Sequence, residues 1–329
     1  MSITFERSVQ VIDSHTAGHP TRVILGGLPK LEGDSVKAQR DDFRENHDAL
    51  RPALLHEPRG HAAMVGAVVV PSRVADVGAF FISSYVYLDM CGHGTIGLAK
   101  TLAAIGEIEV PKTGERCFTL ETPAGVVGVA VETRDGQVVA IRIDNVDCHV
   151  LERSLTVEVD GLGQVDAATA YGGGVFAIVD AKALGLEIAP DNVSELCRIG
   201  ARIKAGLNSR PGLATAHKVG SVLLHQDLGE RHARHLVVLE RNKFDRSPCG
   251  TGTSARLAVL HAAGRLGVGE DFRAEGVLGT EFLCRIERVG ETGGAGFVSP
   301  SIRGLAHITA FSTLVIEASD PLAAGFLCR

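Results

Sequence analysis

The chain carries the stretch CGHGTIGLAKTLAAIG at residues 91–106 and, 158 residues later, the stretch CGTGTSARLAVLHAAG at residues 249–264. The two align without a gap, and seven of their 16 positions are identical, the leading Cys among them. Each predicts the same local structure, in which a Cys precedes a Gly-rich turn, a helix of small and aliphatic residues follows, and a Gly ends it. Because the offset is about half of the 329 residues, a duplicated domain is the economical explanation.

The rest of the chain predicts a strand-rich α+β protein without the strict strand–helix alternation of a doubly wound sheet. Its length exceeds what one core comfortably supports, which favours two domains. Helical spacing occurs at Asp34–Leu50 and Asn192–Leu207. Strand-like runs bounded by turn residues are more numerous: Val9–Asp13, Thr21–Leu25, Ala63–Val70, Ala79–Tyr85, Cys117–Thr122, Val126–Val131, Gln137–Ile143, Val157–Val159, Val175–Val179, Val219–Leu224, Leu236–Leu239, Glu281–Val289 and Ile308–Ile316.

Composition excludes several classes of partner. The net charge of -6, the aromatic content of 5% and the absence of Trp argue against nucleic acid. Apolar runs such as Met64–Val70 are too short to span a membrane, and the N-terminus lacks the pattern of a signal peptide, so we expect a cytoplasmic protein. Seven cysteines lie scattered without a CxxC pair, which predicts free thiols and no metal site.

The position of the repeated cysteines favours acid–base chemistry. A helix N-terminus presents unpaired N–H groups and positive dipole charge, which stabilise a thiolate and bind a carboxylate. Two such helix starts facing each other would hold one carboxylate and leave one sulfur on each side of the α-carbon. Stereoinversion needs this arrangement, because Cys91 or Cys249 takes the α-proton as thiolate while the other delivers a proton as thiol. No cofactor is required if the site stabilises the developing carbanion.

These residues resemble the proline racemase family over nearly the whole chain. The resemblance rests on six motifs: Met90-Cys91-Gly92-His93-Gly94, Asp245-Arg246-Ser247-Pro248-Cys249-Gly250-Thr251-Gly252-Thr253, Asp13-Ser14-His15-Thr16-Ala17-Gly18-His19-Pro20-Thr21-Arg22-Val23, Glu57-Pro58-Arg59-Gly60-His61, Thr122-Pro123-Ala124-Gly125 and Tyr171-Gly172-Gly173-Gly174. It implies a diaminopimelate-epimerase-like fold of two pseudo-symmetric β-barrel-like domains, each around a central helix, with the active site between them.

The resemblance also implies a division of the chain. The first racemase-type domain would comprise residues 1–117 and 304–329 and carry Cys91. The second would comprise residues 118–303 and carry Cys249. The C-terminal strand near Ile308–Ile316 would then return to the first domain, and a homodimer is possible because dimers are common in the family.

Roles follow by motif from the same resemblance. Cys91 and Cys249 correspond to the acid–base thiols, Asp245 to the contact for the ring nitrogen of a small imino-acid substrate, and no cofactor is implied. An anionic partner suits a secondary amine, which is cationic near neutral pH. The substrate carboxylate would be held by four residues next to the thiols: Gly92, His93, Gly250 and Thr251.

Within the family, the SHTAGHPTRV opening at residues 14–23 favours 4-hydroxyproline 2-epimerase, that is, conversion of trans-4-hydroxy-L-proline to cis-4-hydroxy-D-proline. Proline racemase is the alternative. A trans-3-hydroxy-L-proline dehydratase is disfavoured, since such members usually carry Thr in place of Cys249. Epimerases often have a His where this chain has Ser221, with His225 four residues on. Ser221 is therefore a candidate substrate-binding residue, and the group that binds the ring hydroxyl stays open.

Other readings of the same residues are weaker. Residues 92–97 spell the GxGxxG dinucleotide fingerprint, but Ala255 breaks it in the second copy. A Cys–His hydrolase built on Cys91 and His93 would leave Cys249 unexplained. A non-catalytic binding protein would have no reason to keep both thiols. The remaining cysteines show no motif, and we expect them to be structural.

Overall fold

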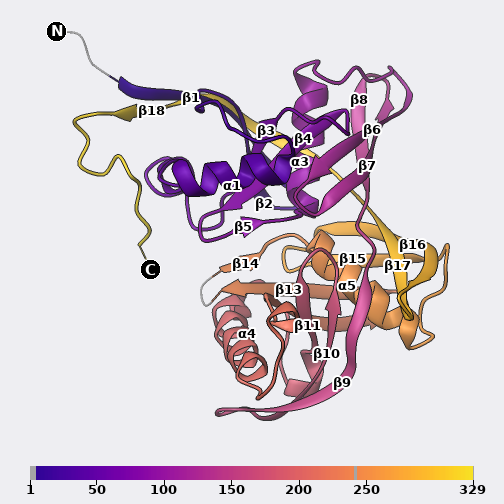
Figure 1. The fold of residues 1–329 in the computed structure, drawn as a ribbon. Coiled ribbons are helices and arrows are strands. Elements are labelled where there is room, and N and C mark those ends of the chain that lie inside the picture. The colour runs from indigo at the N-terminus through magenta and orange to yellow at the C-terminus, as the bar shows by residue number, and fades with distance from the viewer. Residues whose placement is uncertain (1–4, 241–242, 329) are drawn as a thin grey trace. The chain divides into compact units, whose positions relative to one another are not determined.

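The computed structural model describes residues 5–240 and 243–328, which fall into two compact units (Figure 1). Unit 1 comprises residues 1–143 and 305–329, and unit 2 comprises residues 144–304. Both are rich in strands with a central helix, which confirms the predicted α+β class. The boundary expected after residue 117 falls inside strand β6 (Gly114–Thr122), which pairs along its length with β7 (Gly125–Arg134) and stays with unit 1.

Unit 1 is built around paired strands that begin with β1 (Phe5–Thr16) and end with β18 (Ala306–Glu317). β18 pairs antiparallel with β1, and β1 with β2. β2 runs parallel to β3, β3 antiparallel to β4, and β4 both antiparallel to β5 and parallel to β6. The remaining strands are β2 (His19–Gly26), β3 (Val65–Val70), β4 (Val77–Ser83), β5 (Tyr87–Leu88) and β8 (Gln137–Asp144).

Unit 2 repeats this pairing scheme. β9 pairs antiparallel with β10, β10 with β11, and β11 runs parallel to β12. β12 pairs antiparallel with β13, which is antiparallel to β14 and parallel to β15, and β15, β16 and β17 follow as antiparallel neighbours. The strands are β9 (His149–Val159), β10 (Gly163–Tyr171), β11 (Val175–Asp180), β12 (Ser221–Gly229), β13 (His232–Glu240), β14 (Lys243–Asp245), β15 (Asp271–Gly276), β16 (Glu281–Thr292) and β17 (Ala295–Gly304). The shared order of parallel and antiparallel pairs supports the duplication.

The repeated sequence forms the central helix of each unit, as predicted. Helix α3 (Gly92–Ala104) packs against β1, β2, β3, β7 and β18, and helix α5 (Gly250–Ala262) packs against β9, β10, β11, β16 and β17. Both are buried over most of their surface because Gly, Ala, Thr and aliphatic residues occupy nearly every face. Each helix starts directly after its Cys and ends before a Gly with positive φ, Gly106 in α3 and Gly264 in α5.

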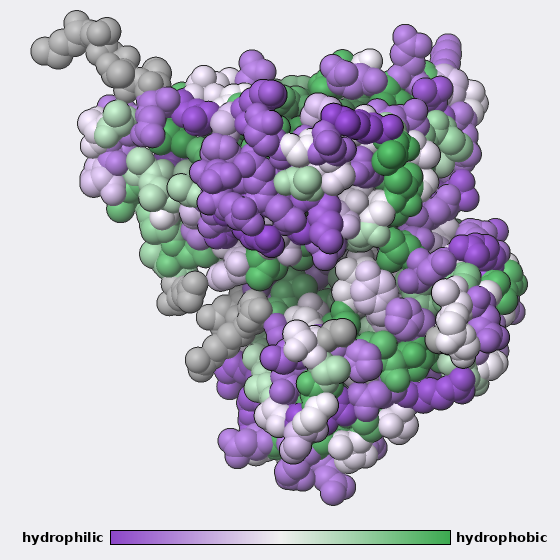
Figure 2. Space-filling model, viewed as in Figure 1, coloured by the Kyte–Doolittle hydropathy of each residue, from purple (hydrophilic) through white to green (hydrophobic). Residues whose placement is uncertain are grey.

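The outer helices are amphipathic. In α1 (Val36–Asn46), Val36 and Phe43 enter the core, and Arg40 is buried in ion pairs with Asp41 and Asp89. Other charged residues such as Lys37, Arg44 and Glu45 are exposed, and Figure 2 shows a hydrophilic surface over this helix. The prediction of a single helix at Asp34–Leu50 is wrong at its C-terminal end. The helix α1 ends at Asn46, and a second helix, α2 (Leu50–Leu55), begins at Leu50. Helix α4 (Val193–Asn208) matches its prediction within a residue. No helix in the described part of the chain is long and apolar enough for a membrane crossing.

Candidate active site

In unit 1, Cys91 is the N-cap of α3. It follows β5 by two residues, its backbone is extended at φ -146°, and its carbonyl accepts the first helical hydrogen bond, from Thr95 N at 2.9 Å. The side chain is buried, with 5% exposed. The thiol therefore lies where the unpaired N–H groups of the helix begin, as the sequence predicted.

An imidazole lies against this thiol. Cys91 Sγ is 3.5 Å from His93 Nδ1 and 3.7 Å from His93 Nε2. The His93 ring meets the ring of His19 edge-on, at 4.3 Å between centroids, and the His93 carbonyl accepts a hydrogen bond from Thr16 Oγ1. A Cβ at Gly94 would come within 3.0 Å of Cys91 Sγ, so only Gly lets the helix pass this close to the sulfur.

His19 and Thr16 belong to the Asp13–Val23 motif, from which no site residue was predicted. His19 is fully buried and contacts the proposed carboxylate-binding His93, so it shapes the site without a sequence pattern of its own. In the sequence, the position of His19 within the SHTAGHPTRV motif is the feature from which its role could have been suspected.

In unit 2, Cys249 is the N-cap of α5 and is equally buried. Unlike Cys91 it has a positive φ of 65°, in the left-handed region that non-Gly residues rarely adopt. Its N–H donates to Ser247 Oγ at 3.1 Å, and both the N–H and the hydroxyl of Ser247 donate to Asp245 Oδ1, at 2.9 and 2.7 Å. Asp245, Ser247 and Cys249 are thus fixed in one turn before the helix.

The predicted carboxylate contact of unit 2 also lies at this turn. Cys249 Sγ is 3.7 Å from Thr251 Oγ1, the counterpart of the contact between Cys91 and His93. Gly250 opens the helix between them. The structure therefore brings four predicted residues of unit 2 together: Asp245, Cys249, Gly250 and Thr251. Cys91, Gly92 and His93 are brought together in the same way in unit 1.

The electrostatics of Cys249 differ from the sequence expectation. Burial, and after it the negative charge of Asp245, hold the pKa of the Cys249 thiol well above its ordinary value. Hydrogen bonds from Gly252 and Thr251 act in the opposite direction but are outweighed. The prediction that the helix N-terminus stabilises the thiolate is not met at Cys249, because desolvation of the buried sulfur outweighs the hydrogen bonds at the helix start.

Ser221 lies at the first position of β12, in register with Phe176 of β11. Alternate residues of a strand share a face, and Leu223, two residues on, packs in one cluster with Phe176 and Cys249. Ser221 is therefore on the face of β12 that carries α5. His225 lies farther along this face, where its Nδ1 is 3.2 Å from Arg256 Nη2.

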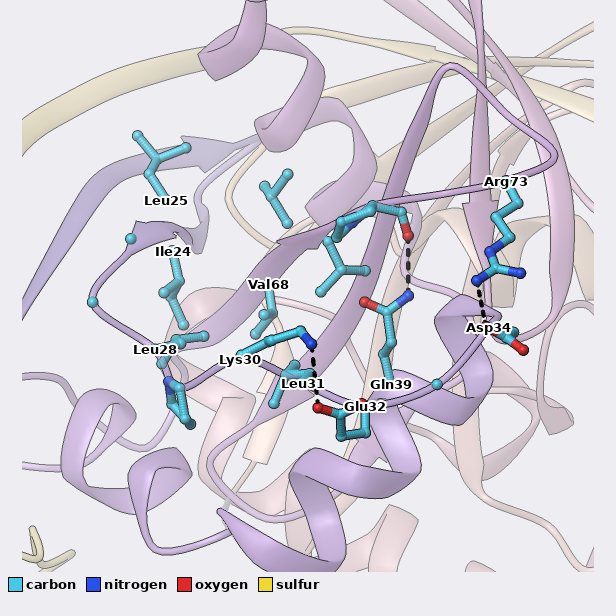
Figure 3. Close-up of a pocket in the computed structure, with 17 residues that line it drawn as sticks. Ile24, Leu25, Leu28, Lys30, Leu31, Glu32, Asp34, Gln39, Val68 and Arg73 are labelled. Atoms are coloured by element: carbon cyan, nitrogen blue, oxygen red, sulfur yellow. Dashed lines mark hydrogen bonds and ion pairs between the residues drawn. The ribbon is translucent and has the colours of Figure 1, made fainter.

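Each unit has another feature that resembles a binding site. The first is a hollow in unit 1 with a volume of about 500 Å³. Apolar residues such as Ile24 and Val68 and exposed ion pairs bound it (Figure 3). Neither Cys nor His lines it, and its charged side chains are engaged in the exposed ion pairs Lys30–Glu32 and Arg73–Asp34.

The second feature is a group of three possible cation ligands in unit 2, His232, Glu275 and Glu281. Glu275 is paired with Arg234 at 2.7 Å, and Glu281 is paired with Arg273 at 2.5 Å. These charges are already compensated on neighbouring strands, and we assign the group to pairing within the sheet.

Comparisons with known proteins agree with the geometry. The family model described as proline racemase matches residues 11–327. A proline racemase of Clostridioides difficile is 38% identical over 336 residues, with 99% of each chain covered. A 4-hydroxyproline 2-epimerase of Streptosporangium roseum is also 38% identical, with 98% of this chain and 99% of the relative covered.

Among solved structures, a hydroxyproline epimerase from Agrobacterium vitis with bound trans-4-hydroxy-L-proline superposes with a TM-score of 0.90. It is 29% identical, and the match covers 98% of this chain and 96% of that one. The family expected from the six motifs is confirmed: the chain belongs to the proline racemase family.

Proposed function

We propose that the protein is a cofactor-independent isomerase that inverts the α-carbon of 4-hydroxyproline, converting trans-4-hydroxy-L-proline to cis-4-hydroxy-D-proline. The observation that carries the proposal is the duplicated helix start, in which a buried thiol stands as N-cap of the central helix in each unit. Two equivalent thiols suit a reaction that removes a proton from one face and returns it on the other. Relatives named 4-hydroxyproline 2-epimerase support the substrate.

In this mechanism, Cys91 and Cys249 alternate as base and acid. The N–H groups at Gly92, His93, Gly250 and Thr251 bind the substrate carboxylate, because a helix N-terminus is suited to an anion. Charge that develops on the carboxylate side during proton removal is stabilised by the same preorganised donors. Asp245 pairs with the cationic ring nitrogen, which holds the substrate at a fixed angle to both sulfurs.

The two thiols start from different protonation states. The raised pKa of Cys249 keeps it as a thiol near neutral pH, so it is the acid of the resting enzyme. Cys91, with the His93 ring against its sulfur, is then the resting base. One turnover protonates Cys91 and deprotonates Cys249, so the reverse direction starts from the opposite protonation state of the pair.

Proline racemase remains a second candidate, because the relative of that name from Clostridioides difficile is as similar as the epimerase from Streptosporangium roseum. The preference for 4-hydroxyproline over proline would depend on a side chain that binds the ring hydroxyl. We propose Ser221 for this contact. Dehydration of trans-3-hydroxy-L-proline is disfavoured, since elimination from one face does not need Cys249.

We further propose that the enzyme works in the cytoplasm and forms a homodimer. All seven cysteines are free thiols, which suits a reducing compartment. On β18, Phe311 and Val315 expose 67% and 41% of their surface, and a second copy could cover them.

The test is proton NMR in deuterated buffer without added cofactor or metal. The purified protein is offered trans-4-hydroxy-L-proline, L-proline and trans-3-hydroxy-L-proline separately. Loss of the α-proton signal together with appearance of cis-4-hydroxy-D-proline is the expected result. Exchange with L-proline alone would establish the racemase, pyrroline formation would establish the dehydratase, and no exchange with any of the three would overturn the proposal.

A further inference from the structure

Helix α5 contains a buried charged residue, Arg256. Arg256 lies two turns after Cys249 in a helix of mostly small and aliphatic residues, and only 2% of its surface is exposed. Its guanidinium is paired with the Asp227 carboxylate and lies 5.3 Å over the ring of Phe272. Such a buried cation needs a reason, since its desolvation is unfavourable.

The same guanidinium fixes the direction of a series of hydrogen bonds that leads back to the thiol. Arg256 Nη1 lies 2.8 Å from His235 Nε2, and because a guanidinium can only donate, Nε2 accepts. The proton of His235 is therefore on Nδ1, which lies 3.1 Å from Thr253 Oγ1 and donates to it. Thr253 Oγ1 in turn donates to the carbonyl oxygen of Pro248 at 3.0 Å.

Burial and the charge of Arg256 hold the pKa of His235 well below its ordinary value, so the ring stays neutral, as the accepting Nε2 requires. His235 and Thr253 are both fully buried. We call Arg256, His235 and Thr253 the support triad. It ends on the peptide group that immediately precedes Cys249.

The duplicated unit provides an internal comparison. In the alignment of the two repeats, Thr95 corresponds to Thr253 and Leu98 to Arg256. The buried hydroxyl of Thr95 has no hydrogen-bond partner among the residues that the structure describes. Without such support, Cys91 has an ordinary extended backbone, whereas Cys249 has a φ of 65°. The unusual backbone thus occurs in the half that has the triad.

We propose that His235 and Arg256 are positioning residues for Cys249, which act through the Thr253 hydroxyl to hold the Pro248 carbonyl and so keep the Cys249 backbone in its left-handed conformation. A non-Gly residue persists in that region only where the surroundings hold it. Ser247, which is held by Asp245, restrains the same turn by accepting a hydrogen bond from the Cys249 N–H. The role in catalysis rests on the function proposed above, while the control of the Cys249 conformation does not.

The central experiment is Thr253→Val, which removes the hydroxyl and keeps the shape. Thr95→Val is the matched control, since the same change at the equivalent position of unit 1 removes a hydroxyl without a partner. We expect Thr253→Val to lower kcat at least about tenfold with KM changed less than about threefold, because a misplaced group impairs the reaction more than binding. Thr253→Ser, which retains the hydroxyl, restores kcat to near the original value.

A second readout does not depend on turnover. Peptide mapping after timed iodoacetamide treatment measures the alkylation rate of each cysteine at one pH. In Thr253→Val, we expect the rate of Cys249 to rise at least about fivefold as its backbone relaxes, while that of Cys91 changes less than about twofold. A folded Thr253→Val protein with unchanged Cys249 labelling, or with both thiols changed equally, would overturn the proposal.

The two nitrogens of His235 allow a further separation. In His235→Asn the amide nitrogen replaces Nδ1, so the bond to Thr253 can persist, whereas His235→Gln places its amide near Nε2 and loses that bond. We expect the Gln variant to show the Cys249 labelling of Thr253→Val, and the Asn variant to stay close to the original rate. The reverse order would refute the direction assigned to the triad. If the epimerase activity itself is absent, the labelling pattern still decides whether the triad holds Cys249.

Discussion

Gly172→Ala is expected to impair catalysis through the first turn of α5. A Cβ at Gly172 would lie 2.4 Å from the Thr251 carbonyl oxygen and 2.7 Å from Ala255 N, both of which are backbone atoms of α5. An ordinary contact begins at 3.4 Å, so the carbonyl would have to retreat by about 1.0 Å. The site cannot yield by rotating a side chain, because the helix itself has to move.

Two magnitudes follow. Overpacking of this kind costs about 1–3 kcal/mol, which lowers Tm by roughly 2–12 °C for a domain of this size. A displacement near 1 Å in a catalytic group can lower the rate about a hundredfold. Since Thr251 and Cys249 are two residues apart at this helix start, we expect kcat/KM to fall by about 30- to 100-fold.

The control is Gly174→Ala in the same motif, because the nearest atom to its new Cβ is Phe176 Cε2 at 3.7 Å. Epimerisation followed by polarimetry and unfolding followed by circular dichroism would be compared for both variants. We expect Gly174→Ala to remain within about twofold of the original rate. If Gly172→Ala keeps both its kcat/KM and its Tm, the close approach of Gly172 to α5 does not constrain the site, and the reasoning fails.

Three further outcomes are expected. Cys91→Ser and Cys249→Ser should each lower kcat by about 10³-fold at unchanged Tm, because a hydroxyl is a far weaker acid than a thiol, and substantial turnover in either would contradict the two-thiol mechanism. Asp245→Asn removes the anion that helps to raise the pKa of Cys249, so the pH midpoint of Cys249 alkylation should move down while kcat/KM falls. An unmoved midpoint would show that burial alone raises this pKa. Arg22→Ala breaks a buried pair with Asp13 and should lower the free energy of unfolding by about 3–5 kcal/mol, measured by thermal or urea unfolding. Arg73→Ala, which breaks an exposed pair with Asp34, should lower it by less than about 1 kcal/mol. Equal effects of the two substitutions would refute the distinction between buried and exposed pairs.

The sequence predicted the central helices well because several signals coincide there. Small residues permit burial on all sides, glycines mark both ends, and the repeat doubles the evidence. Strands that contain runs of β-branched residues were also predicted, because these runs are a strong local pattern. β17 was missed because Pro300 and two glycines weaken its strand pattern, and β15 because charged residues alternate with buried ones over only six positions.

Other features depend on tertiary contacts and leave little trace in sequence. The break between α1 and α2 follows from Asp48, whose carboxylate binds Arg51 and Tyr87 from β5. The raised pKa of Cys249 reflects burial, which no local pattern reports. The support triad could have been suspected only from Arg256, a charged residue within an otherwise buried helix, since His235 lies 21 residues away on β13.

The two units share one fold but differ around their thiols, and the proposed substrate offers a reason for this difference. A substrate carboxylate and α-carbon present similar demands to both thiols, and the helix starts that serve them are conserved between the repeats. In the proposed mechanism the ring nitrogen approaches one thiol only, so one half alone needs an anion there. Asp245 has no acidic counterpart in unit 1, because the repeat offset of 158 residues places Tyr87 at that position. That anion opposes ionisation of Cys249. A more firmly held turn, fixed by Ser247 at the Cys249 N–H and by the support triad at the Pro248 carbonyl, then keeps the thiol in a constant position. The asymmetry of the substrate thus accounts for the asymmetry between two units that share one fold.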